Sequence, residues 1–225
     1  MALAIDLVPS SEAAFIAGLT DKEMHRMVDE GVLPEALYQR SDGRRFTRVA
    51  GAFAKFYFET GDQFTKTLRR EVIEELTRRL LLRDDHDQAL ALGVAVTAMD
   101  WSVRLPFGSV ALLEIVRTVQ ERALRVARAN RRITEDPQVM DGVPVFAGTR
   151  VPIETVVSSR AAGINAERLR ASYPFLTPEL IEDAEIYLRI HPRRGRPRKL
   201  GGADGANPTW KTVSRRTVRP ASERA

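Results

Sequence analysis

Apolar positions at the start of the chain recur with the spacing of short helices that are separated by tight turns. They predict a first helix over residues 12–17, which Gly18 would end. Thr20 followed three residues later by Glu23 is a capping-box pattern and predicts a second helix, which Gly31 would end. Two short helices joined by a glycine-containing turn predict a helix-turn-helix.

A basic segment follows these two helices. Asp42-Gly43 is a strong signal for a two-residue hairpin turn, and arginines flank it on both sides. This pattern predicts a wing, which is a β-hairpin that lies beside the second helix. The arginines of the wing segment are Arg40, Arg44, Arg45 and Arg48.

The middle of the chain combines helical and strand-like patterns. Apolar residues spaced by four predict a helix over residues 63–83, and β-branched and aromatic residues between Val94 and Phe107 predict one or two strands. The longest helix is predicted over residues 109–131. Its apolar stripe can pack inside the chain or against a second copy, and packing inside is favoured because the stripe is too short for a dedicated coiled coil. The stripe consists of Leu112, Val116, Val119, Ala123 and Val126.

From Arg132 onward, turn residues and apolar residues predict two short strands followed by three short helices. Pro152 would begin the first of these helices, and Asn165 would cap the second. Thr177 would cap the third, with Pro178 at its first helical position. A hairpin followed by three helices predicts a small trihelical domain.

The end of the chain has a different composition. Residues 192–208 are rich in glycine and proline, so they are predicted to form no core and to be disordered. The predicted fold is therefore mainly α with small β-hairpins, and it has four parts. These are a winged helix-turn-helix head at residues 1–60, a central helical and strand region at 61–131, the trihelical domain at 132–190 and a disordered basic tail at 191–225.

Charge is distributed unevenly along the 225 residues. Residues 189–225 contain eleven basic and two acidic residues, which gives them a formal charge of +9, whereas the rest of the chain carries −4. A mildly acidic body with a basic end indicates an anionic partner, which would be nucleic acid or an acidic protein surface. Residues 193–199, with Gly195-Arg196-Pro197 near their centre, are similar to an AT-hook, and the alternative is an extended basic linker.

The residue inventory argues against an enzyme. The chain has no cysteine and only three widely separated histidines, which excludes disulfide frameworks and thiolate metal sites and leaves little for a Ser-His-Asp relay. The acidic run Asp84-Asp85-His86-Asp87 is expected to be a solvated helix end rather than a metal site. No catalytic residue, cofactor or metal is therefore expected. Because the chain has neither a long apolar run nor a basic leader, it is predicted to be soluble and cytoplasmic, without membrane contact.

Two groups of basic residues are candidates for DNA binding. Lys22, His25 and Arg26 lie early in the second predicted helix, where they would reach into the major groove. The alternative is an ordinary amphipathic helix, because several acidic residues share this segment. The arginines of the wing segment are candidates for phosphate or minor-groove contacts, since only Asp42 opposes them.

Two parts of the chain resemble known families. Gly18-Leu19-Thr20, Gly31-Val32-Leu33-Pro34 and Arg44-Arg45-Phe46 follow one another as in the winged helix-turn-helix of MerR-type regulators. Residues 132–188 resemble the domain-of-unknown-function 433 family. The motifs that carry this second resemblance are Asp136-Pro137, Gly142-Val143-Pro144, Gly148-Thr149-Arg150-Val151-Pro152, Gly163 and Tyr173-Pro174-Phe175-Leu176-Thr177-Pro178-Glu179.

Together these resemblances imply a VapB-type antitoxin, whose partner is a PIN-domain ribonuclease toxin. Such a protein would bind operator DNA as a homodimer and repress its own operon. Its tail would place arginines in the acidic, Mg²⁺-binding site of the toxin and an aromatic side chain in a nearby apolar groove. The tail residues with this role would be Trp210, Lys211, Arg215, Arg216 and Arg219. The alternative is a stand-alone MerR-like DNA-binding transcription regulator, whose tail only strengthens DNA binding.

Overall fold

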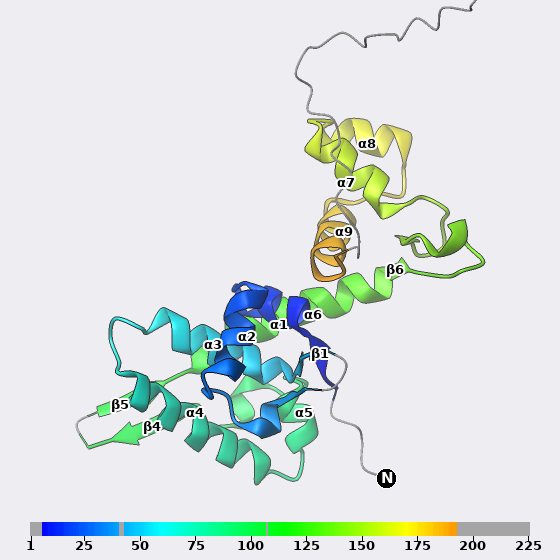
Figure 1. The fold of residues 1–225 in the computed structure, drawn as a ribbon. Coiled ribbons are helices and arrows are strands. Elements are labelled where there is room, and N and C mark those ends of the chain that lie inside the picture. The colour runs from blue at the N-terminus through cyan, green and yellow to red at the C-terminus, as the bar shows by residue number, and fades with distance from the viewer. Residues whose placement is uncertain (1–5, 41–42, 107, 193–225) are drawn as a thin grey trace, which may run out of the picture. The chain divides into compact units, whose positions relative to one another are not determined.

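The computed structural model describes residues 6–40, 43–106 and 108–192. Within these ranges the chain is mainly helical, and short antiparallel strands connect some of the helices (Figure 1). None of the helices in the described ranges has both the length and the apolar character that crossing a membrane requires. The predictions made for the tail, including the disorder of its residues, lie outside the described residues.

The two helices of the predicted helix-turn-helix form as expected. Helix α1 covers Ser10–Ala17, and Gly18 ends it with a left-handed φ of 74°. Helix α2 covers Asp21–Asp29. The capping box is confirmed, because the Thr20 hydroxyl accepts the Glu23 backbone N–H while the Glu23 carboxylate accepts the Thr20 backbone N–H. Local signals in the sequence are therefore sufficient to define this pair of helices.

Three short strands form a sheet beside these helices. Strand β1 is Val8–Pro9, β2 is Tyr38–Gln39 and β3 is Arg45–Phe46, and the order in the antiparallel sheet is β1-β3-β2. A short 3₁₀ turn at Glu35–Leu37 precedes β2. The β2–β3 pair confirms the predicted hairpin of the wing. Phe46 on β3 is completely buried, so the wing is attached to the core of the head.

A helix that the sequence patterns did not indicate follows the wing. Helix α3 covers Arg48–Glu59 and is buried along most of its length. A Cβ atom at Gly51 would lie 3.1 Å from Cγ1 of Ile16 and 3.3 Å from the Ala13 carbonyl oxygen. The missing side chain at Gly51 therefore allows α1 and α3 to pack closely.

The central region consists of helices around one hairpin. Its elements are α4 (Lys66–Leu81), α5 (His86–Leu90), the 3₁₀ turn Val96–Ala98, β4 (Ser102–Leu105), β5 (Gly108–Ala111) and α6 (Leu113–Arg132). The prediction that the longest helix begins at residue 109 is wrong, because residues 108–111 pair with β4. Gly108 is the first residue of this strand. The helix itself starts only at Leu113.

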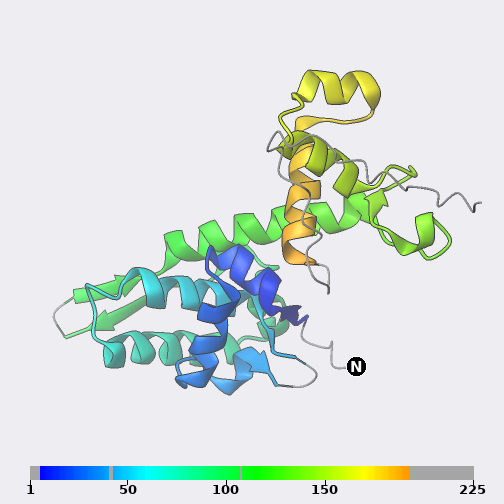
Figure 2. The ribbon, with the colours of Figure 1, turned by 45° about the horizontal axis from the view of Figure 1, so that its top comes forward.

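The apolar stripe of α6 packs inside the chain, as predicted. Its five residues, Leu112 directly before the helix and four within it, are buried in a core that also contains the buried apolar residues of α1, α2 and α3. Figure 2 shows the long helix α6 running beside the helices of the head. The head and the central region thus share one hydrophobic core. The boundary expected between residues 60 and 61 lies between α3 and α4, inside the region that this core holds together.

The remaining described residues form a second, smaller core. Strands β6 (Ile133–Thr134) and β7 (Val145–Phe146) pair, with a 3₁₀ turn at Met140–Gly142 between them. Three helices follow: α7 (Ile153–Ala161), α8 (Ala166–Ser172) and α9 (Pro178–Ile190). The predicted caps are confirmed, because Asn165 accepts the Arg168 backbone N–H and Thr177 accepts that of Leu180. The sequence therefore predicts this trihelical arrangement well.

Helix α9 connects the second core to the first. Its carboxylate Asp183 is completely buried and accepts hydrogen bonds from Arg128 at 2.8 Å and Arg132 at 3.0 Å, both on α6. At the end of α9, the carbonyl oxygen of Ile190 accepts a hydrogen bond of 2.6 Å from the Ser11 hydroxyl on α1. The trihelical part is therefore attached both to the long helix and to the head.

Candidate nucleic-acid interface

The three DNA-binding candidates on α2 have different environments. Lys22 is exposed near the start of the helix, while His25 is only partly exposed. Nε2 of His25 is buried and has no hydrogen-bond partner among the described residues. The Arg26 side chain is 58% exposed, but its Nε lies 2.5 Å from Oε1 of Glu30. Within the described residues, Lys22 is thus the exposed cation of this group that forms no ion pair.

Glu30 neutralises part of the positive charge near Arg26. Its carboxylate also accepts a hydrogen bond of 2.8 Å from Nζ of Lys66 on α4. Hydrogen bonds from Arg26 and Lys66 lower the pKa of Glu30 to about 2, so this carboxylate stays charged at neutral pH. Arg26 is consequently half of a local ion pair, and its net attraction for a phosphate is reduced.

Arg44 attaches the wing to α2. Its guanidinium forms two hydrogen bonds with the Asp29 carboxylate, at 2.6 and 3.1 Å, and a third with the His25 carbonyl oxygen at 3.0 Å. The hydrogen bond from Arg44 lowers the pKa of Asp29, which keeps this carboxylate charged. Arg44 therefore fixes the position of the hairpin relative to α2.

Arg48 is directed into the protein. Its side chain is 18% exposed and forms ion pairs with Glu12, at 3.1 Å, and with Asp6, at 2.5 Å. Burial raises the pKa of Glu12 above its usual value, and the Arg48 charge opposes that shift. The guanidinium of Arg48 thus compensates a buried carboxylate, and the structure does not present it to a phosphate.

Two wing arginines remain exposed. The Arg40 guanidinium lies over the ring of Tyr38, 5.6 Å from its centroid. Arg45 donates a hydrogen bond of 3.0 Å to the carbonyl oxygen of Leu7, which uses one of its five N–H groups. Among the described residues, Lys22, Arg40 and Arg45 form no ion pair with a carboxylate, although the charge of Arg40 contributes to the lowered pKa of Asp29.

Asp29 is a residue of this candidate site that the sequence patterns do not single out. As an acidic residue on α2 it counts against a DNA-binding surface, yet it is the partner that holds Arg44. The signal that could have found it is a carboxylate in the last turn of the second helix combined with an arginine just after the hairpin turn. Its charge is therefore compensated inside the head.

The remaining sequence predictions concern the acidic run, metal binding and the tail. In the acidic run at residues 84–87, Asp85 forms two hydrogen bonds with Arg83. No group of potential metal ligands occurs within the described ranges. The tail residues predicted to bind a toxin, Trp210, Lys211, Arg215, Arg216 and Arg219, lie outside the residues that the structure describes.

Comparisons with known proteins cover most of the chain. Residues 133–188 match the family described as protein of unknown function DUF433. Over 197 residues the chain is 34% identical to the uncharacterized protein y4eO of Sinorhizobium fredii (strain NBRC 101917 / NGR234), and this match covers 87% of the chain and 86% of y4eO. No solved structure matches the chain. The chain therefore belongs to the same protein family as y4eO and carries a DUF433 domain at residues 133–188.

Proposed function

We propose that this protein binds duplex DNA through its head and acts as an antitoxin that represses its own operon. The observation that carries DNA binding is the Arg44 contact, which joins the hairpin to α2 as one unit. A recognition helix and a wing held in a fixed arrangement can contact adjacent parts of a duplex without paying the entropy of ordering on binding. Lys22, Arg40 and Arg45 are exposed on this unit.

The roles of the exposed cations follow from their positions. Lys22 lies in the first turn of α2, the part of a recognition helix that approaches the bases and phosphates of the major groove. Arg40 and Arg45 lie on β2 and β3 or directly beside them, where a wing meets the sugar-phosphate backbone. Two such heads in a homodimer would match a two-fold symmetric operator.

Replacing Lys22 or Arg45 with alanine is expected to weaken binding to the DNA upstream of the gene that encodes this protein. Each substitution removes one phosphate contact, so the slope of log K against log salt should become shallower by about 1. Fluorescence anisotropy with a labelled duplex at several salt concentrations measures both the affinity and the slope. Arg44→Ala should weaken binding as well, because it frees the wing from Asp29.

Arg78→Ala is the matched control for this experiment. Arg78 is an exposed arginine on α4 that is paired with Glu75, outside the helix-turn-helix and the wing. This variant is expected to bind DNA with the affinity and slope of the unmodified protein. If Lys22→Ala and Arg45→Ala leave the slope unchanged, the head does not contact the DNA backbone through these residues.

The antitoxin part of the proposal is supported by the DUF433 domain and by the basic residues after Pro192. Arg215, Arg216 or Arg219 would pair with the carboxylates that hold Mg²⁺ in a PIN-domain ribonuclease, and Trp210 would fill an apolar groove beside them. Binding of this kind would displace the metal ion and inhibit the ribonuclease.

Co-expression with the neighbouring gene tests this part. The full chain is expected to restore growth of cells that express the neighbouring protein, whereas a chain ending at Pro192 is not. Pro192 is the appropriate end point because Ile190 is buried and accepts the hydrogen bond from Ser11. Equal rescue by both chains would remove the tail from the inhibition. A neighbouring protein without toxicity would favour the stand-alone regulator.

A further inference from the structure

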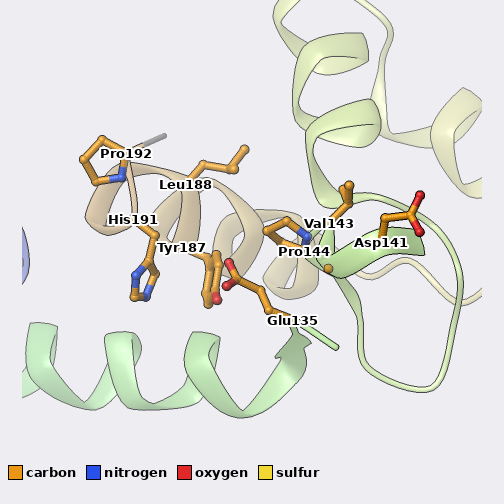
Figure 3. Close-up of a pocket in the computed structure, with 9 residues that line it drawn as sticks. Glu135, Asp141, Val143, Pro144, Tyr187, Leu188, His191 and Pro192 are labelled. Atoms are coloured by element: carbon orange, nitrogen blue, oxygen red, sulfur yellow. The ribbon is translucent and has the colours of Figure 1, made fainter. Parts of the chain in front are cut away.

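A cavity outside the head lies in the DUF433 domain. It has a volume of about 460 Å³ and opens between residues 135–144 and the last turn of α9 (Figure 3). Its polar residues are Glu135 and Asp141 on the first side and Tyr187 and His191 on the second. Val143, Pro144 and Leu188 supply apolar walls. The cavity therefore combines carboxylates, aromatic rings and hydrocarbon surface.

Glu135 is held against an aromatic ring. Tyr187 is only 8% exposed, and its hydroxyl forms a hydrogen bond with the Glu135 carboxylate. Figure 3 shows the Glu135 carboxylate beside the Tyr187 ring, with Asp141 at the other side of Pro144. Burial and the negative charge of Glu135 raise the pKa of Tyr187 to about 12, so the phenol stays neutral and donates its proton to this bond.

His191 extends the aromatic surface without adding charge. Its ring lies 4.3 Å from the Tyr187 ring, measured between centroids. Burial lowers the pKa of His191 below its usual value, so the imidazole is neutral at neutral pH. A neutral imidazole does not repel a cation. The second side of the cavity is thus a pair of uncharged rings, inclined at 39° to each other, beside a carboxylate.

The two carboxylates have no positively charged partner among the described residues. Arg128 and Arg132, near the end of α6, form ion pairs with Asp183 and not with these two carboxylates. Glu135 also retains acceptor positions beyond the bond from Tyr187, because a carboxylate can accept about four hydrogen bonds. Within the described part of the chain, no cation therefore compensates the negative charge of the cavity.

We propose that this cavity binds the guanidinium group of an arginine side chain. A planar guanidinium can donate two parallel hydrogen bonds to Glu135 while one of its faces lies against a ring of the Tyr187–His191 pair. The aliphatic part of the arginine side chain would contact Val143 and Leu188. A lysine ammonium is more strongly hydrated and cannot stack, so it fits this combination of groups less well. The proposal does not depend on DNA binding by the head.

The arginine can come from two sources. One is a partner polypeptide. The other is the chain itself, because Pro192 lines the cavity and the sequence continues with Arg193 and Arg194. The experiment therefore compares the full chain with a full-length variant in which Arg193, Arg194, Arg196 and Arg198 are all replaced with serine.

The probe is N-acetyl-L-arginine amide, and N-acetyl-L-lysine amide is the comparison ligand. NMR signals of the Tyr187 and His191 rings report binding at the cavity itself. The arginine probe is expected to shift both sets of signals, and the lysine probe should bind about tenfold more weakly. Glu135→Gln should lower the affinity for the arginine probe about tenfold, as expected for the loss of a charged hydrogen-bond acceptor.

Glu167→Gln is the matched control for Glu135→Gln, because Glu167 is an exposed acid on α8 outside the cavity.

The outcomes for the full chain and the serine variant identify the source of the arginine. Equal binding of the arginine probe by both chains supports the proposal with a partner polypeptide as the source. Binding only by the serine variant supports it with the chain's own arginines as the source. Absence of binding by both chains overturns the proposal. Equal responses to the two probes, or equal weakening by Glu167→Gln and Glu135→Gln, also overturn it.

Discussion

A fragment made of residues 1–60 is expected to be unfolded in solution, although it contains the complete helix-turn-helix and the wing. The buried residues of α1 and α3 belong to the same core as the apolar stripe of α6, so the fragment would expose most of that interface to water. Domains of this size bury too little surface to tolerate such a loss. Circular dichroism and heteronuclear NMR of the fragment measure its helix content and side-chain order.

A fragment of residues 1–132 is the control for this experiment. It retains α6 and therefore the shared core, and it is expected to unfold cooperatively at a lower denaturant concentration than the full chain. The difference arises because it lacks Ile186 and Ile190 of α9, which pack against the same core. Cooperative unfolding of residues 1–60 alone would show that the head is an independent folding unit.

Asp183→Ala is expected to reduce the free energy of unfolding of the full chain by about 3–5 kcal/mol. Asp183 is completely buried, and its carboxylate is the common acceptor for Arg128 and Arg132. Both arginines keep some solvent exposure, so they can be partly hydrated after the substitution, and we expect a value near the lower end of this range. Urea unfolding of the full chain, followed by circular dichroism, measures the change.

Glu182→Gln is the matched control for Asp183→Ala. Glu182 precedes Asp183 on α9 and forms ion pairs with Arg125 and Arg128, but its side chain is 46% exposed. A pair of this kind contributes less than about 1 kcal/mol, because water and salt screen it. Equal decreases in the free energy of unfolding from the two substitutions would show that burial does not distinguish the two carboxylates.

The elements that the sequence predicts best are those with local signals. The capping box at Thr20, the Asn165 cap and the Thr177-Pro178 pair all act within one helical turn, and the structure confirms each of them. Helix α3 does not stand out in the sequence because most of its residues are apolar, so that Lys55 and Glu59 mark only a narrow polar face. Strand β5 was read as the start of a helix because its identity depends on pairing with β4.

The same limit applies to the candidate site. The sequence identifies the basic residues of the head, but it cannot show which of them are already paired. Arg44 meets Asp29 and Arg48 meets Glu12 only after the chain has folded, because these partners are far apart in the sequence. The distinction between a cation that holds the wing and one that is exposed to solvent is therefore a property of the tertiary structure.

The end of α9 lies beside the beginning of α1. Besides the Ser11 contact with Ile190, the guanidinium of Arg189 lies 5.5 Å from the centroid of the Phe15 ring. A fluorescent dye attached at position 192 would therefore lie next to the head, the region that we propose binds DNA. With such a dye, a single titration can test both the proposed binding of DNA and the proposed binding of a second macromolecule.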